Sequence, residues 1–163
     1  MRRFEMDREN ERHGNLQKVP AAGPQNPDLK TLLDYIEDIE GEKADEYAIF
    51  SLEGVIKSRF AGMQENDTKI SQLRKFYDDV VTLDQDPSYS APEINSRLAR
   101  IIPLARYSYA RGNLDEPLLK LLDGGIRIIS RENDAVKKRS MLTRFRRILE
   151  AVVAYKKEPK RRS

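Results

Sequence analysis

The sequence predicts an all-α protein, a compact helical bundle of about five to six helices with a mobile N-terminal arm. Apolar residues recur at spacings of three and four over most of the chain after Pro27, as in amphipathic helices. Capping residues, glycines and prolines separate these stripes, and neither a β-hairpin pattern nor a fixed-period repeat is present. At 163 residues, the chain is long enough to bury one hydrophobic core.

Three regions are expected along the chain. Residues 1–27 are charged and then rich in Pro, Gly, Asn and Gln, which predicts a flexible N-terminal arm. Residues 28–157 are predicted to form a single helical domain, and residues 158–163 a basic tail.

The first two predicted helices lie between Asp28 and Gly62. The first takes Asp28 as its N-cap and ends at Gly41, with the apolar stripe Leu29, Leu32, Leu33, Ile36 and Ile39. The second is predicted to continue through Gly54 and to end near Gly62. Its stripe is Ala44, Tyr47, Ala48, Val55, Ile56 and Phe60.

The third helix is predicted to start near Thr68 and to stop before Pro87, with the stripe Ile70, Leu73, Phe76, Tyr77, Val80 and Leu83. The fourth begins with a capping box, Ser90 and Glu93, and ends at Gly112. Pro103 inside it predicts a kink. Its apolar positions include Ile94, Leu98, Ile101, Ile102, Leu104 and Tyr107.

The fifth helix starts at Asp115 and Pro117 and carries Leu118, Leu121, Leu122, Ile126 and Ile129. Gly124 and Gly125 in its middle predict either a bend or a close helix contact. The last helix, within 134–157, has the stripe Val136, Leu142, Phe145, Leu149, Val152 and Tyr155, surrounded by lysine and arginine.

Charge is distributed unevenly, although the chain carries 30 basic and 27 acidic residues in total. Acids dominate between Asp28 and Lys57, and bases dominate from Lys137 to Ser163. Like charges at helical spacings repel, so a basic helix of this kind favours a polyanionic partner, of which nucleic acid is the commonest.

Several chemistries are excluded by composition. The chain has no cysteine and a single histidine, His13 in the predicted arm, so thiolate, Ser-His and His-metal sites lack parts. Gly124-Gly125 is not followed by the Lys-Ser/Thr of a phosphate loop. We therefore expect a non-enzymatic protein without cofactors. No apolar run approaches the roughly 20 residues of a membrane span, and the composition fits a cytoplasmic protein.

Three segments carry a family resemblance. Residues 68–76, TKISQLRKF, are similar to the TxSQ(I/L)RxF opening of the small subunits of type III-A CRISPR (Csm) interference complexes. Residues 103–112, PLARYSYARG, resemble that family's PxxxYxxxR(G) segment. Residues 149–157, LEAVVAYKK, resemble its closing EAIVAYxK. The order and spacing of the three segments also agree, whereas residues 1–65 have no counterpart in the resemblance.

The resemblance implies a non-catalytic subunit acting in antiviral defence. Several copies line up beside the backbone subunits of the effector complex and brace guide RNA and target RNA through their phosphates. RNA cutting and signal synthesis belong to other subunits, including the large one. The implied partners are therefore guide and target RNA, the backbone and large subunits, and further copies of the chain.

Candidate RNA contacts lie on three predicted helices. The third carries Arg74 and Lys75, and the fourth carries Arg97, Arg100 and Arg111. The last helix has the densest cluster, Lys137, Lys138, Arg139, Arg144, Arg146 and Arg147, of which all but Arg146 are candidate contacts. Arginine offers a planar fork that matches phosphate oxygens. Tyr107 is at a core spacing, which favours packing over base stacking.

Alternatives remain for these residues and for the whole chain. Arg74 has Asp78 and Asp79 within one turn, Arg111 could cap a helix end, and the last helix could pair with the acids of another protomer. The alternative function is a dimeric helix-turn-helix regulator of duplex DNA, although the basic helix lacks the polar base-reading residues that such a regulator needs. A third interpretation is a protein–protein adaptor.

Overall fold

The computed structural model describes residues 27–37, 45–61 and 69–156. Within these ranges the chain is helical and forms no strand, which confirms the all-α prediction. The elements are α2 (Pro27–Glu37), α3 (Glu46–Phe50), the π-helical turn η1 (Lys57–Ala61), α4 (Ile70–Gln85), α5 (Ala91–Ala110), α6 (Glu116–Arg131) and α7 (Ala135–Lys156). The predicted arm before Pro27 and the predicted basic tail lie outside the described residues, as do Ile39, Gly41 and Gly62.

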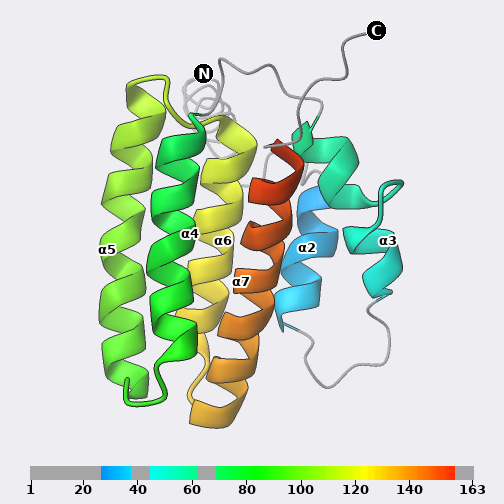
Figure 1. Cartoon of the computed structure of the whole chain (residues 1–163). Helices are drawn as coiled ribbons and strands as arrows, with labels where there is room; N and C mark the ends of the chain where they lie inside the picture. The colour runs from blue at the N-terminus through cyan, green and yellow to red at the C-terminus, as the bar shows by residue number, and fades with distance from the viewer. Residues whose placement is uncertain (1–26, 38–44, 62–68, 157–163) are drawn as a thin grey trace, which may run out of the picture.

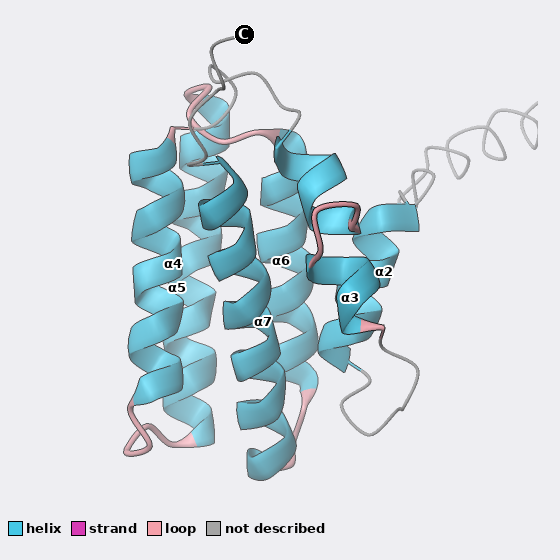
Figure 2. Cartoon of the chain, turned by 45° about the vertical axis from the view of Figure 1, so that its right-hand side comes forward, coloured by secondary structure: helices cyan, strands magenta, loops and turns pink. Residues whose placement is uncertain are grey.

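The four long helices α4 to α7 lie side by side, with α4 and α5 at one end of the molecule and α2 and α3 at the other (Figures 1 and 2). Helix α7 lies between these two parts and packs against α4, α6, α2 and η1. The bundle is therefore organised around its last helix.

Helix α7 is apolar around much of its circumference because it has neighbours on several sides. Leu142, Phe145, Leu149 and Val152 are fully buried, as their spacing predicts, and Ile148 joins them in the core. The prediction that Val136 also belongs to the buried stripe is wrong, since its side chain is 76% exposed. It lies in the first turn of α7, beyond the level at which the neighbouring helices end (Figure 1).

The predicted second helix is in fact two short elements. Helix α3 ends at Phe50, and the extended backbone of Ser51 leads into a turn before η1. A β-carbon on Gly54 would lie 2.8 Å from the carbonyl oxygens of both Ala48 and Ile49. Gly54 is thus required where the chain folds back onto α3, rather than being tolerated inside a helix.

The predicted caps of α5 and α6 are confirmed. The Ser90 hydroxyl accepts a hydrogen bond from the Glu93 N–H (3.3 Å), and the Asp115 carboxylate accepts one from the Leu118 N–H (2.9 Å). Helix α5 continues without interruption past Pro103 to Ala110. At the start of α2, Asp28 lies in the first turn rather than at the cap.

Of the two predictions for Gly124 and Gly125, a bend or a close helix contact, the structure shows the close contact. Helix α6 runs unbroken through both glycines. A β-carbon on Gly125 would lie 2.5 Å from Cε2 of Phe145 on α7, and one on Gly124 would lie 3.0 Å from the methyl groups of Leu33 on α2. The two glycines therefore let α6 approach two other helices closely.

Lys138 lies in the core although the sequence placed it in a surface cluster. Its side chain is 1% exposed, and its ammonium donates hydrogen bonds to the Asn95 Oδ1 (2.5 Å) and to the Ile129 carbonyl oxygen (2.8 Å). Burial lowers the pKa of Lys138, an effect that the Glu132 carboxylate partly opposes. The ammonium thus joins α7 to α5 and α6.

We predict different responses at the two glycines of α6. Gly125→Ala should lower the free energy of unfolding by about 1–3 kcal/mol, because the Phe145 ring must shift within a packed core. Gly124→Ala should be close to neutral, because the flexible end of Leu33 can move and alanine favours the helix. Urea denaturation of both variants measures the difference, and equal stabilities would contradict the packing described.

Charge reversal should distinguish two adjacent lysines of α7. Lys138→Glu should destabilise the fold by about 3 kcal/mol or more, because a buried carboxylate would face two oxygen acceptors. Lys137→Glu, at a half-buried position, is the matched control and should retain most of the stability. If thermal melts of the two variants coincide, Lys138 is not buried in solution.

The lowered pKa of Lys138 also predicts a pH effect. The unfolded chain, with an ordinary lysine pKa of 10.5, binds more protons than the folded chain between the two pKa values. This lysine therefore adds stability as pH rises through its folded pKa towards 10.5. Lys138→Met should lose that alkaline increment, which denaturant titrations of both proteins at several alkaline pH values would detect.

Candidate nucleic-acid interface

Most cations of α7 make contacts within the protein. The Arg139 guanidinium donates to the carbonyl oxygens of Asp86 (2.9 Å) and Tyr89 (2.8 Å), in the loop that joins α4 to α5. Arg146 forms an ion pair with Asp84 on α4 and a second with Glu150 (3.1 Å). Partial burial acts to lower the pKa of Arg146, but the hydrogen bond and charge of Asp84 outweigh it and raise the pKa.

The acidic N-terminal helices occupy another side of α7. The Arg144 guanidinium stacks on the Tyr35 ring, 4.6 Å from its centroid, and donates to the Tyr35 carbonyl oxygen (2.6 Å). Arg147 lies 3.9 Å from Glu46, which accepts a hydrogen bond from the Tyr35 hydroxyl (3.2 Å). Burial is the main cause that raises the pKa of Tyr35. The pairing between the basic helix and the acidic block, considered above as an alternative between two protomers, is thus present within one chain.

These contacts change the role of the predicted α7 cluster. The prediction for Lys138 is wrong, because its ammonium is buried. Arg139 and Arg144 are only partly exposed and hold neighbouring elements in place. Arg147 has a side chain that is 50% exposed, and Lys137 is partly exposed. The helix with the highest density of positive charge in the sequence is therefore chiefly a scaffold.

The other predicted contact residues are all exposed and belong to α4 and α5. Arg97 and Arg100 are exposed on α5, and Arg111 is exposed at its C-cap. With Leu104 and Tyr107 they form one stripe, at spacings of three, four, three and four. From Arg97 to Arg111 this stripe extends about 21 Å at about 1.5 Å per residue. Arg74 and Lys75 are exposed on α4, the neighbouring helix. We call these five basic residues and the stripe the α4–α5 face.

Charge on the α4–α5 face is not neutralised locally. Arg74, Lys75 and Arg100 have no ion-pair partner among the residues that the structure describes. Arg97 stacks on the Tyr89 ring at 4.6 Å, and this contact leaves its charge uncompensated. The alternative that Asp78 or Asp79 pairs with Arg74 is not realised in the described geometry.

Aromatic side chains accompany these cations. Tyr107 is 59% exposed, so the prediction that it packs in the core is wrong. The Arg111 guanidinium lies 5.5 Å from the centre of its ring and donates to its hydroxyl (2.9 Å). The buried stripe of α5 is Ile94, Leu98, Ile101, Ala105 and Ser108, and this spacing, applied strictly, would have placed Leu104 and Tyr107 outside.

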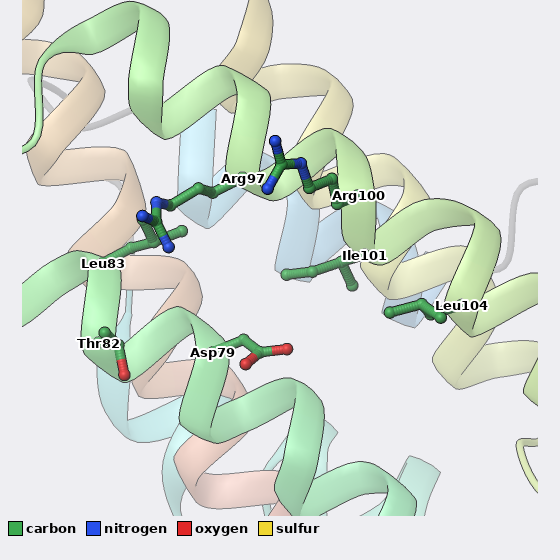
Figure 3. Close-up of a pocket in the computed structure, with 7 residues that line it drawn as sticks. All are labelled: Asp79, Thr82, Leu83, Arg97, Arg100, Ile101 and Leu104. Carbon is green, nitrogen blue, oxygen red and sulfur yellow. The ribbon is translucent and has the colours of Figure 1, made fainter.

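A groove of about 190 Å³ separates the two helices of this face (Figure 3). Helix α5 contributes Arg97, Arg100, Ile101 and Leu104, and α4 contributes Asp79, Thr82 and Leu83. Sequence reasoning missed Asp79 and Thr82 as parts of a site. Both lie on α4, and they line a groove only because α5 packs beside α4.

Other kinds of site receive no support. In the described ranges, no group of three or more His, Asp or Glu side chains is arranged to hold a metal ion. None of the described helices is long and apolar enough to cross a membrane.

A family model, Csm2 Type III-A, matches residues 55–162. The match covers well over half of the chain, including the three segments of the resemblance, the α4–α5 face and the whole of α7, while α2 and α3 precede it. No curated protein and no solved structure matches. The family match leaves the DNA-regulator alternative without support. The chain belongs to the Csm2 Type III-A family and is a small subunit of the type III-A CRISPR (Csm) complex.

Proposed function

We propose that this subunit braces guide RNA and target RNA inside the Csm complex, without catalysing a reaction, and that the α4–α5 face holds the RNA backbone. The complex must accept guides of any sequence, so its small subunit needs phosphate contacts rather than base readout. Exposed arginines and a lysine supply such contacts, and exposed Tyr107 offers a sequence-tolerant stacking surface.

The observation that carries this proposal is the uncompensated charge on one face. Arg74, Lys75 and Arg100 keep their full hydrogen-bonding capacity towards a ligand, since the described residues offer them no ion-pair partner. The α7 cations that pair with Asp84, Glu46 and backbone oxygens would have to give up those partners first. The net free energy of binding a phosphate is therefore more favourable at the α4–α5 face than at the α7 cations.

Two residues of α7 remain secondary candidates in this proposal. Arg147 and Lys137 are partly exposed and would add long-range attraction for RNA. Arg139 and Arg144 support the fold instead. Exposed acids on and near α2 and α3, such as Asp34 on α2 and Glu53 in the turn after α3, would repel RNA and suit basic surfaces of the backbone subunits, the large subunit or a further copy.

A double charge reversal tests the location of the RNA surface. Arg74→Glu with Arg100→Glu should lower the affinity of the full chain for single-stranded RNA by about tenfold or more, equally for unrelated sequences. The slope of log affinity against log salt should become shallower by about 0.7 for each phosphate that the variant no longer neutralises. Filter binding at several salt concentrations measures both quantities.

The control is a reversal elsewhere on the surface. Lys120 on α6 is 58% exposed and pairs with Glu116 (3.0 Å), and Lys30 on α2 is 66% exposed and pairs with Asp34 (3.9 Å). Lys120→Glu with Lys30→Glu therefore makes the same change in net charge outside the proposed surface. It should leave the salt slope unchanged, and circular dichroism should report equal helicity in all proteins. A loss of RNA affinity as large in this double control would show that net charge, and not this face, governs binding.

A further inference from the structure

The groove between α4 and α5 combines three kinds of chemistry within a small volume. Ile101 and Leu83 are buried and form an apolar floor with the half-exposed Leu104. Arg97 and Arg100 provide positive charge from α5, and Asp79 provides a carboxylate from α4. Figure 3 shows the Asp79 carboxylate pointing into the space between the helices, with Arg97 extending across it towards Leu83.

The two signs of charge in this groove do not neutralise each other. Asp79 makes no ion pair with a described residue, although two guanidinium groups line the same groove. Elsewhere on α4, Asp84 is paired directly with Arg146. Asp79 can therefore still accept hydrogen bonds from a ligand. The groove has one wall on α5 that could bind an anion, through Arg97 and Arg100, and one wall on α4 that could accept a hydrogen bond, through Asp79.

A carboxylate is unfavourable beside phosphates unless the ligand also donates a hydrogen bond to it. The nucleotide backbone has one such donor, the ribose 2′-hydroxyl, which DNA lacks. A sugar ring also fits the remaining features. The groove volume of about 190 Å³ exceeds the roughly 150 Å³ cavity known to hold a benzene ring, and the apolar floor matches the carbon face of a sugar.

We propose that this groove is a ribose subsite that selects RNA over DNA, an inference that rests on the proposed function. Arg97 and Arg100 hold the flanking phosphates, and Asp79 accepts a hydrogen bond from the 2′-hydroxyl. The Thr82 hydroxyl already donates to the Asp78 carbonyl oxygen (2.9 Å), so it can still accept at the rim. The subsite reads the sugar and is indifferent to the base.

The test compares RNA, 2′-O-methyl RNA and DNA of one sequence on the full chain. Wild type should bind RNA about five- to tenfold more tightly than either of the other two, the effect of one hydrogen bond to a charged acceptor at a partly exposed site. Asp79→Asn should reduce the ratio of RNA to 2′-O-methyl RNA affinity, because a neutral amide oxygen accepts a hydrogen bond more weakly than a carboxylate. Affinity for DNA and for 2′-O-methyl RNA should rise, because a repulsive charge is removed.

Asp78→Asn is the matched control, because Asp78 is the adjacent acid on α4 but does not line this groove. It should raise affinity for all three strands equally and leave the wild-type ratio unchanged. Equal binding of RNA and DNA by wild type, or the same ratio in Asp79→Asn, would overturn the ribose subsite while leaving RNA bracing intact. A wild-type protein that binds neither strand would instead overturn the proposed function.

Discussion

The structure depends on the burial of one helix, α7, by neighbours on several sides. Its apolar residues supply much of the core, with Phe145 packed against Gly125 of α6 and Leu149 and Val152 fully buried. A helix in that position can keep basic residues only where they find partners inside the protein. Lys138 finds the Asn95 side chain and a backbone oxygen, and Arg146 finds Asp84. Among the described residues, most exposed cations without an acidic partner lie on α4 and α5 or at their ends, and Arg131 on α6 is an exception.

The two acidic helices α2 and α3 are joined to α7 by several contacts. Helices α2 and α3 precede the region that the family model matches, yet they cover α7 and line up with its cations. Arg144 on the Tyr35 ring, and Arg147 near Glu46, join the two parts electrostatically. The Tyr155 hydroxyl also donates to the Phe50 carbonyl oxygen. The acidic block therefore has a structural role in this chain, whatever surfaces its outer residues meet.

The sequence predicted elements well where the deciding interaction is local. The Ser90 and Asp115 caps depend on residues three positions away, and spacing alone found Leu142 and Phe145. The predictions from sequence failed where contacts with segments distant in the chain determine the local structure. The turn at Gly54 depends on a close approach to α3, and the burial of Lys138 depends on Asn95 from another helix. The candidate site divides in the same way: exposed Arg100 follows from helical spacing, whereas the partners of Arg139 and the groove around Asp79 exist only after packing.

The clamp that Arg139 forms on the loop between α4 and α5 has a mechanical consequence. Two hydrogen bonds from one guanidinium fix the carbonyl groups of Asp86 and Tyr89, and the ring of Tyr89 in turn lies against Arg97. Arg139 on α7 thus restrains the loop between α4 and α5, and through Tyr89 it also restrains Arg97. An RNA strand that bound there, as proposed, would meet a stiff surface, so little conformational freedom would be lost on binding.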